Sequence, residues 1–200
     1  MVVIKQGGVP EMYLERKDNI EENATIVFNC NVNEKNLSNF PKNFNGNIVI
    51  YGEIDVCDKI CIPGNLFVKG DIYCETLTVK GNFQLIGDIE GNIDVCGNCD
   101  IQGDIDAEII NIKEDFYYSG EYLKVENLFV NGDFSFTGLN IYGNTVIVAG
   151  NCYGSSETFF ENLQILGDIN YKRLKSTIFG SLSATKEITA TNVKITNLNW

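Results

Sequence analysis

A column of acidic residues is the first feature of the sequence that could do chemistry. It consists of Glu53, Asp71, Asp88, Asp104 and Glu121, each directly after a glycine. The column is interrupted at Leu139 and resumes at Glu157. Stacked carboxylates could bind divalent cations, which prefer oxygen ligands, or supply the acid and base of a glycosidase. The alternative is that each carboxylate accepts hydrogen bonds from the amides of its own turn and points into solvent.

We favour the turn interpretation and keep the five residues as candidate metal ligands only. The RTX-type calcium pattern GGxGxDxUx is absent from the sequence. A hydrolase also needs its two carboxylates in different environments, whereas this column is uniform. The sequence therefore identifies no catalytic residue and no cofactor.

The cysteines form a second group with possible chemistry. They are Cys30, Cys57, Cys61, Cys74, Cys96, Cys99 and Cys152. Cys96 and Cys99 have CxxC spacing, which binds zinc when a second pair lies nearby or supports redox chemistry at the start of a helix. The Cys57 and Cys61 pair lies two repeat units away, and the CxxC spans a turn. We therefore interpret the cysteines as small core or wall residues, although an exposed Cys96–Cys99 pair could form a disulfide.

Composition excludes several classes of function. The 200 residues include no histidine, which removes Ser-His-Asp and Cys-His catalysis and histidine-ligated metals. A formal charge of −12 argues against nucleic acid as a partner. No apolar stretch approaches the roughly 18 residues of a membrane span, and we recognise no secretory signal. We expect a cytoplasmic protein with no membrane span.

A repeat of about 17 residues organises the chain. Clear units start at Gly46, Gly64, Gly81 and Gly97, and a last, degenerate unit starts at Ala184. Each unit contains three short segments with alternating apolar residues, the period of strands rather than of helices. Three strands and three turns per unit predict an all-β, single-stranded parallel β-helix of triangular section with about 8–9 coils. The general rule for parallel crossovers favours a right-handed winding.

Aliphatic columns predict the three inner walls of this solenoid. One wall contains Ile62, Val79, Val95, Ile112, Val130, Val148, Ile165 and Leu182, with Ile60, Leu77, Ile93, Ile110, Leu128, Val146 and Leu163 two positions earlier. The second contains Ile48, Leu66, Phe83, Cys99, Phe116, Phe134, Cys152 and Ile169. The third contains Ile54, Ile72, Ile89, Ile105 and Tyr122. Glycines at the turns allow backbone conformations that other residues rarely adopt.

A second polar column is predicted to be structural. It contains Asn47, Asn65, Asn82, Asn98, Asp115, Asp133, Asn151 and Asp168. Stacked amide side chains can hydrogen-bond along the axis, as they do in cross-β ladders. Aromatic residues also gather in the middle units, at Phe116, Tyr117, Tyr118, Tyr122, Phe134, Phe136, Tyr142 and Tyr153. We expect most of these to fill the core and the others to form an exposed strip suited to sugars or proteins.

The two ends of the solenoid differ. Residues 1–45 lack clean periodicity and carry a charged run, so we predict an N-terminal cap with an irregular first coil over Thr25–Val32, and a β-helix domain over residues 46–200. The last unit has no charged or helical cover. We therefore expect self-association through its residues Val193, Ile195, Leu198 and Trp200.

The runs GNLFVKGDIYC, GNFQLIGDIEGNIDV and GNCDIQGDIDAEIINI resemble the bactofilin family of bacterial polymer-forming cytoskeletal proteins. The likeness is good over residues 46–112 and loose elsewhere. It implies a right-handed triangular β-helix that assembles end to end into filaments without nucleotide and acts as a scaffold for cell-wall or division proteins. The left-handed β-helix of hexapeptide acyltransferases is similar in period only, and its catalytic histidine is absent here.

Three functional hypotheses follow. The first is a non-catalytic scaffold that self-associates as a homo-oligomer and offers surfaces to protein partners. The second is a carbohydrate- or calcium-binding module that uses the exterior aromatics and the acidic column. The third is an enzyme acting on polysaccharides through Asp71, Asp88 and Asp104.

Overall fold

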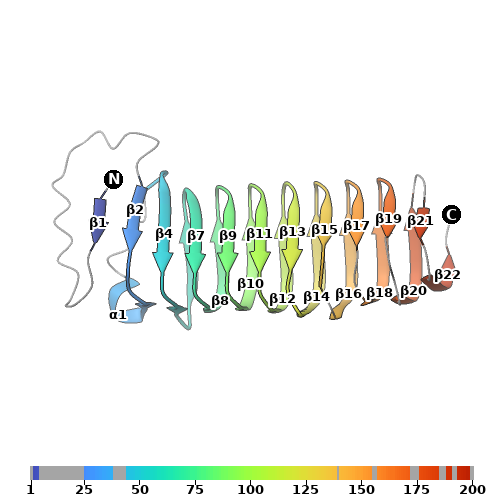
Figure 1. The fold of residues 1–200 in the computed structure, drawn as a ribbon, viewed down its shortest axis with the longest axis horizontal. Helices are drawn as coiled ribbons and strands as arrows, with labels where there is room; N and C mark the ends of the chain where they lie inside the picture. The colour runs from blue at the N-terminus through green and yellow to red at the C-terminus, as the bar shows by residue number, and fades with distance from the viewer. Residues whose placement is uncertain are drawn as a thin grey trace.

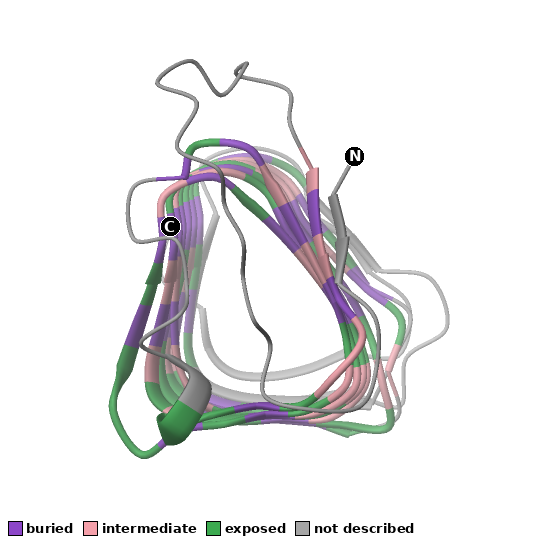
Figure 2. Ribbon diagram, turned by 90° about the vertical axis from the view of Figure 1, so that its left-hand side faces the viewer, coloured by how far each residue is buried: buried purple, intermediate pink, exposed green. Residues whose placement is uncertain are grey.

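The computed structural model describes residues 2–4, 25–37, 44–138, 140–154, 157–171, 176–184, 188–190 and 193–198, and the side chains of 25–35, 44–138, 140–154 and 162–168. In this part of the chain the strands stack in chain order along one axis (Figure 1). Viewed along that axis, the backbone has a triangular outline with three sides (Figure 2). The predicted all-β parallel solenoid is confirmed.

The first side of the triangle is an 11-stranded parallel sheet. Its strands are β1 (Val2–Ile4), β2 (Thr25–Phe28), β4 (Asn47–Tyr51), β7 (Asn65–Lys69), β9 (Phe83–Ile86), β11 (Cys99–Gln102), β13 (Phe116–Ser119), β15 (Phe134–Phe136), β17 (Cys152–Gly154), β19 (Ile169–Tyr171) and β21 (Ile188–Ala190). From β4 onward, each predicted repeat unit contributes one strand. The first two strands lie in the segment for which the sequence predicts a cap and an irregular coil.

The second sheet bends around a corner and forms the other two sides. Its strands are β3 (Val32–Asn33), β5 (Ile54–Asp55), β6 (Lys59–Ile62), β8 (Ile72–Val79), β10 (Ile89–Val95), β12 (Ile105–Ile112), β14 (Tyr122–Val130), β16 (Asn140–Val148), β18 (Glu157–Ile165), β20 (Ser176–Ala184) and β22 (Val193–Leu198). β5 and β6 both pair with β8, so one coil uses two strands where the next uses one continuous strand. A four-residue helix, α1 (Glu34–Leu37), follows β3; the sequence analysis did not predict it.

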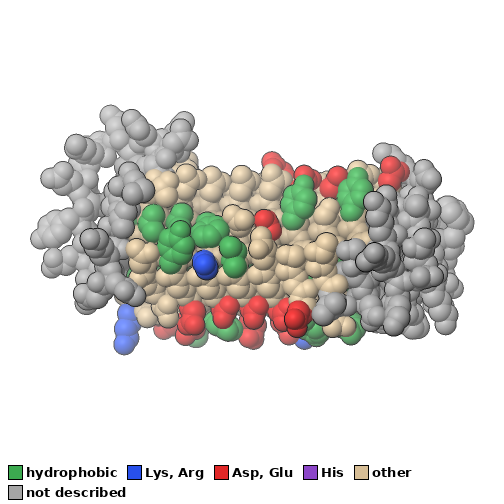
Figure 3. Space-filling model, in the orientation of Figure 1, with side chains coloured by type: hydrophobic (Ala, Val, Ile, Leu, Met, Phe, Trp, Pro, Cys, Tyr) green, Lys and Arg blue, Asp and Glu red, His purple; other side chains and the backbone are tan. Residues whose placement is uncertain are grey.

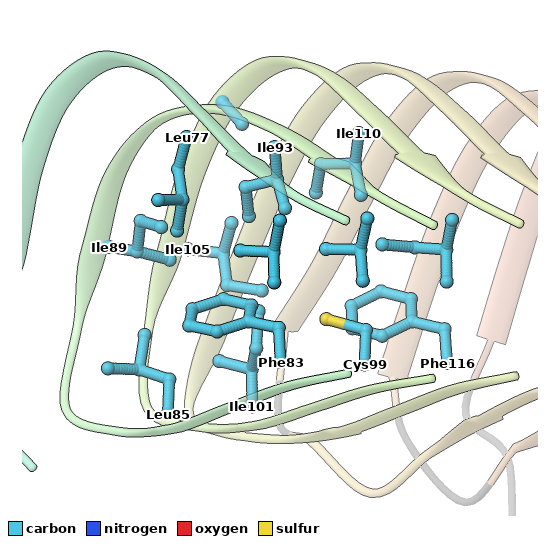
Figure 4. Close-up of a cluster of buried hydrophobic side chains, with 14 of the residues drawn as sticks. Leu77, Phe83, Leu85, Ile89, Ile93, Cys99, Ile101, Ile105, Ile110 and Phe116 are labelled. Carbon is cyan, nitrogen blue, oxygen red and sulfur yellow. The ribbon is translucent and has the colours of Figure 1, made fainter. Parts of the chain in front are cut away.

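The register places equivalent side chains of neighbouring coils over one another. Ile48 pairs with Leu66, Leu66 with Phe83, and Phe83 with Cys99. Alternation along each strand then sends every second side chain into the prism. Figure 4 shows this interior, where Phe83, Cys99 and Phe116 lie in one row and Ile89 and Ile105 in another.

The predicted inner walls are confirmed wherever side chains are described, with one exception. Residues of all three walls between Ile48 and Ile165 are buried. The exception is Tyr122, which is 37% exposed, while its neighbour Leu123 pairs with Ile105 and is fully buried. The prediction used a fixed offset from the glycine, but this coil carries one additional residue at the turn. Leu182 and Ile169 have no described side chains.

The three corners differ in how much length variation they accept. Corner A joins the third side to the first, and three residues separate Ile62 from Leu66 and Val148 from Cys152. Corner B joins the first side to the second, and three residues separate Ile101 from Ile105 but four separate Tyr118 from Leu123. Corner C joins the second side to the third and varies most, with register shifts next to Glu90.

Candidate functional site

The carboxylate column lies at corner B and forms a hydrogen-bonded ladder between coils. The Asp88 amide donates to Asp71 Oδ1 at 2.9 Å, and the Asp104 amide donates to Asp88 Oδ1 at 2.8 Å. Asp104 Oδ1 accepts from two amides, those of Glu121 and Tyr122, at 2.9 and 2.8 Å. The second amide belongs to Tyr122, the additional residue of that coil. The Asp104 carboxylate therefore also accepts a hydrogen bond from the inserted residue.

This arrangement corrects the prediction for the acidic column in one respect. Each aspartate was expected to accept hydrogen bonds from its own turn, but Asp71, Asp88 and Asp104 accept them from the next coil. Glu53 extends the same pattern toward the N-terminus, since its amide donates to Asn31 Oδ1 at 3.1 Å and its carboxylate accepts from Asn31 Nδ2 at 3.3 Å. Within the described residues, no group of three or more Cys, Asp or Glu side chains could hold a metal ion. Leu139 lies outside those residues, as does the side chain of Glu157.

The Asn and Asp column at corner A forms a second ladder of the same design. The amides of Asn82, Asn98 and Asp115 donate to the side-chain oxygens of Asn65, Asn82 and Asn98 at 2.7, 2.9 and 3.0 Å. The ladder continues through Asp133, Asn151 and Asp168. The predicted axial hydrogen bonding is confirmed, and the donor is usually a backbone amide. Side chain to side chain bonding occurs at Asn65, whose Nδ2 donates to Asn47 Oδ1 at 2.9 Å.

Glycines beside both ladders allow the coils to approach closely. At corner A the Gly81 amide donates to the Gly64 carbonyl at 3.0 Å, and the Gly97 amide to the Gly81 carbonyl at 3.1 Å. A Cβ atom on Gly103 would overlap the Gly87 carbonyl oxygen of the coil below. The glycine columns are therefore required by packing between coils as well as by the turns themselves.

The cysteines divide into inner and outer groups. Cys99 and Cys152 are fully buried wall residues, as predicted, and Cys30, Cys74 and Cys96 are partly buried. Burial raises the pKa of the Cys74 thiol to about 11, and burial followed by nearby Asp100 raises the pKa of the Cys99 thiol well above its usual range. Cys57 and Cys61 are exposed, so the prediction of core or wall positions is wrong for both. Corner C is longest in their coil, and it carries Cys57 outward.

The aromatic cluster divides equally between interior and surface. Phe116, Tyr118, Phe134 and Phe136 are buried, and the rings of Phe116 and Phe134 stack with centroids 5.1 Å apart. Tyr117, Tyr122, Tyr142 and Tyr153 are exposed. The expectation that most of the cluster fills the core is therefore wrong. Strand alternation explains Tyr117 and Tyr153, and the additional residue at corner B explains Tyr122.

The first sheet also exposes an apolar patch that the sequence analysis missed. It consists of Val49, Tyr51, Phe67 and Ile86, around Lys69, and it occupies one part of this face (Figure 3). The Tyr51 and Phe67 rings meet edge to face with centroids 6.2 Å apart. Acidic side chains gather along the edge below it (Figure 3). The alternation of outward positions on successive strands was the signal that could have identified the patch.

The predicted self-association residues lie at the far end of the solenoid. Val193, Ile195 and Leu198 fall in β22, whose side chains are not described, and Trp200 lies outside the described residues. Among the described strands, β22 pairs only with β20 and β21 only with β19. The last coil of the described region thus has a strand partner on one side.

Of three comparisons with known proteins, the one with protein families gives a match. The family model Bactofilin, described as polymer-forming cytoskeletal, matches residues 19–123. No curated protein and no solved structure matches the chain. No helix in the described residues is long and apolar enough to cross a membrane. The family match covers more than half of the chain and includes the coils with the most regular ladders, so the chain belongs to the Bactofilin family.

Proposed function

We propose that this protein is a non-catalytic scaffold that self-associates end to end through its solenoid. The single observation that carries the proposal is the one-sided pairing of β21 and β22 among the described strands. A parallel strand with one partner presents a row of backbone N–H and C=O groups that a further strand can pair with. The family description, polymer-forming cytoskeletal, supports the same function.

The ladders at corners A and B join neighbouring coils along the solenoid axis, up to Asp168 at corner A and up to Tyr122 at corner B. At both corners side-chain oxygens accept from the adjacent coil along the axis. An added coil in the same register would continue this pattern. The acidic edge at corner B, by contrast, opposes side-by-side contact there, because like charges repel at close range.

Sedimentation velocity and negative-stain electron microscopy of the full chain test this proposal. We expect large species whose proportion rises with protein concentration. The double variant Val193→Lys with Ile195→Lys places two charges in β22 and should sediment as a small species. Gln164→Lys, an exposed position in β18, is the matched control and should behave as the wild type.

Far-UV circular dichroism checks that both variants keep their strand content. The wild type provides the second arm, which does not depend on any variant folding. A wild type that stays strictly monomeric at high concentration would overturn the proposal. Assembly of the folded double variant at wild-type level would place the contact elsewhere than β22.

A further inference from the structure

An open groove runs over the first sheet between corner A and the apolar patch. It crosses β2, β4, β7 and β9 and has a volume of about 390 Å³, within the range of small-ligand sites. One wall is the amide row of Asn47, Asn65 and Asn82, and the other is Val49, Phe67 and Gln84. Neither ladder nor end assembly uses the second wall.

The groove contains no charged residue among its ten lining residues, although charged residues make up 21% of the chain. A phosphate or carboxylate ligand would need cationic partners, which the lining does not supply. The lining instead offers four amide side chains and the Thr25 hydroxyl. Amides and hydroxyls both donate and accept hydrogen bonds, so they match a neutral ligand rich in hydroxyl groups.

Two polar groups remain available for a ligand after the internal hydrogen bonds are assigned. Asn82 Oδ1 accepts from the Asn98 amide, which leaves Asn82 Nδ2 as a donor. Gln84 Nε2 donates to Asp100 Oδ2 at 3.3 Å, which leaves Gln84 Oε1 as an acceptor. Asn82 directly precedes β9 and Gln84 lies within it, on either side of the inward-facing Phe83, and both line the same groove.

Phe67 supplies an aromatic wall beside these groups. It is half-buried, and its ring meets the Tyr51 ring edge to face with centroids 6.2 Å apart. Aromatic residues bury large apolar areas while losing few rotamers. A sugar ring presents an apolar C–H face for such a contact and hydroxyls around its edge.

An extended peptide fits this groove less well than a sugar. β4, β7 and β9 each pair with a neighbour on both sides, so their backbone groups are already used. The groove therefore has no free strand edge for β-augmentation. An acyl chain would need a continuous apolar lining, and the amide row interrupts it.

From this geometry we propose that the groove between the corner A amides and Phe67 binds a neutral saccharide strand lying along the solenoid axis. Phe67 stacks on a sugar ring, and Asn82 Nδ2 and Gln84 Oε1 bond its hydroxyls. The groove lies on a side of the solenoid, away from β21 and β22.

Saturation-transfer difference NMR on the full chain tests the proposal, and it remains usable when the protein assembles. The probes are cellotetraose and tetra-N-acetylchitotetraose, which are neutral, and tetragalacturonate, which is anionic. We expect saturation transfer to the ring C–H protons of at least one neutral probe and much weaker transfer to the anionic one. Absence of transfer to both neutral probes, or equal transfer to the anionic probe, overturns the proposal.

Variants of the groove locate the binding. Phe67→Leu keeps apolar volume but removes the ring, and it should weaken binding at least tenfold, whereas Phe67→Trp should retain it. Gln84→Ala should weaken binding several-fold. Tyr117→Ala lies on the same outward column as Phe67, two coils beyond Gln84, and it should bind as the wild type. Wild-type binding by Phe67→Leu, or an equal loss in Tyr117→Ala, contradicts the assigned groove.

Discussion

The coils before and after Ile112 differ in the side chains that fill their interior and in the length of corner B. From Ile48 to Ile112 the walls are mainly aliphatic, and three residues bridge corner B in each coil. From Phe116 to Phe136 aromatic rings fill the first side, and corner B is bridged by four residues. Corner A keeps its length throughout. The comparison indicates that the Asn and Asp ladder at corner A fixes the stacking register, while corners B and C accommodate changes in coil length.

Single-residue deletions give the largest expected difference between the two corners. Deletion of Lys113, in corner A, shifts Phe116 out of its inward phase and removes the Asp115 rung. We expect it to lower the free energy of unfolding by more than about 4 kcal/mol. Deletion of Tyr122 shortens corner B to the three-residue bridge of the earlier coils. This deletion should lower the free energy of unfolding by only about 1–2 kcal/mol. Chemical denaturation measures both, and equal losses would contradict the distinction.

Corner C provides the next test, because neighbouring coils place Gly91 and Ala107 there. Gly91 has φ of +138°, and a Cβ atom at this position would overlap the Cys74 carbonyl oxygen. Gly91→Ala should therefore destabilise the protein by about 2–4 kcal/mol. Ala107→Gly, the matched change in the next coil, should lower the free energy of unfolding by about 1 kcal/mol. The same loss in both variants would show that the bend at Gly91 carries no special constraint.

The corner B ladder predicts a smaller effect. Asp104→Ala removes the acceptor of two amides, whereas Asp88→Ala removes the acceptor of one. We expect Asp104→Ala to lower the free energy of unfolding by about 1–3 kcal/mol and Asp88→Ala to lower it by less. Asp104→Asn keeps an acceptor oxygen and serves as the control, with near wild-type stability. Thermal unfolding measures the order, and Asp88→Ala as the most harmful variant would contradict it.

The smallest effect concerns Tyr118, the buried phenol in the aromatic coils. Burial first, and then nearby Asp104 and Asp88, raise the pKa of Tyr118 above its usual range. The folded state therefore keeps this proton at a pH where the unfolded chain loses it, so stability should fall as pH rises above about 10. Tyr118→Phe should flatten that alkaline decline.

At neutral pH the same variant should change stability by less than about 1 kcal/mol, because it removes one hydroxyl and leaves the buried ring in place. Denaturation midpoints at pH 7 and over pH 9–11 provide the measurement. An unchanged alkaline decline in Tyr118→Phe would show that other groups cause it.

The sequence predicted the solenoid because its strongest signal, one inward residue of each wall per coil, repeats from Ile48 to Ile165. It failed where a coil changes length. Tyr122 was placed by counting from a glycine, and only stacking against Ile105 shows that Leu123 is the inward residue. At corner B the acceptors were predicted by type, but their donors lie one coil away, as at Asp71 and Asp88. The groove beside Phe67 depends on side chains from several coils, which no single unit reveals.

Fibre diffraction or cryo-electron microscopy of the assembled protein tests the central claim most directly, namely that coils stack along one axis and the stack continues from chain to chain. The account predicts filaments with strands perpendicular to the filament axis and a meridional spacing of about 4.7–4.9 Å. Assemblies with strands running along the filament axis, or a protein that forms no assembly at any concentration, would contradict it.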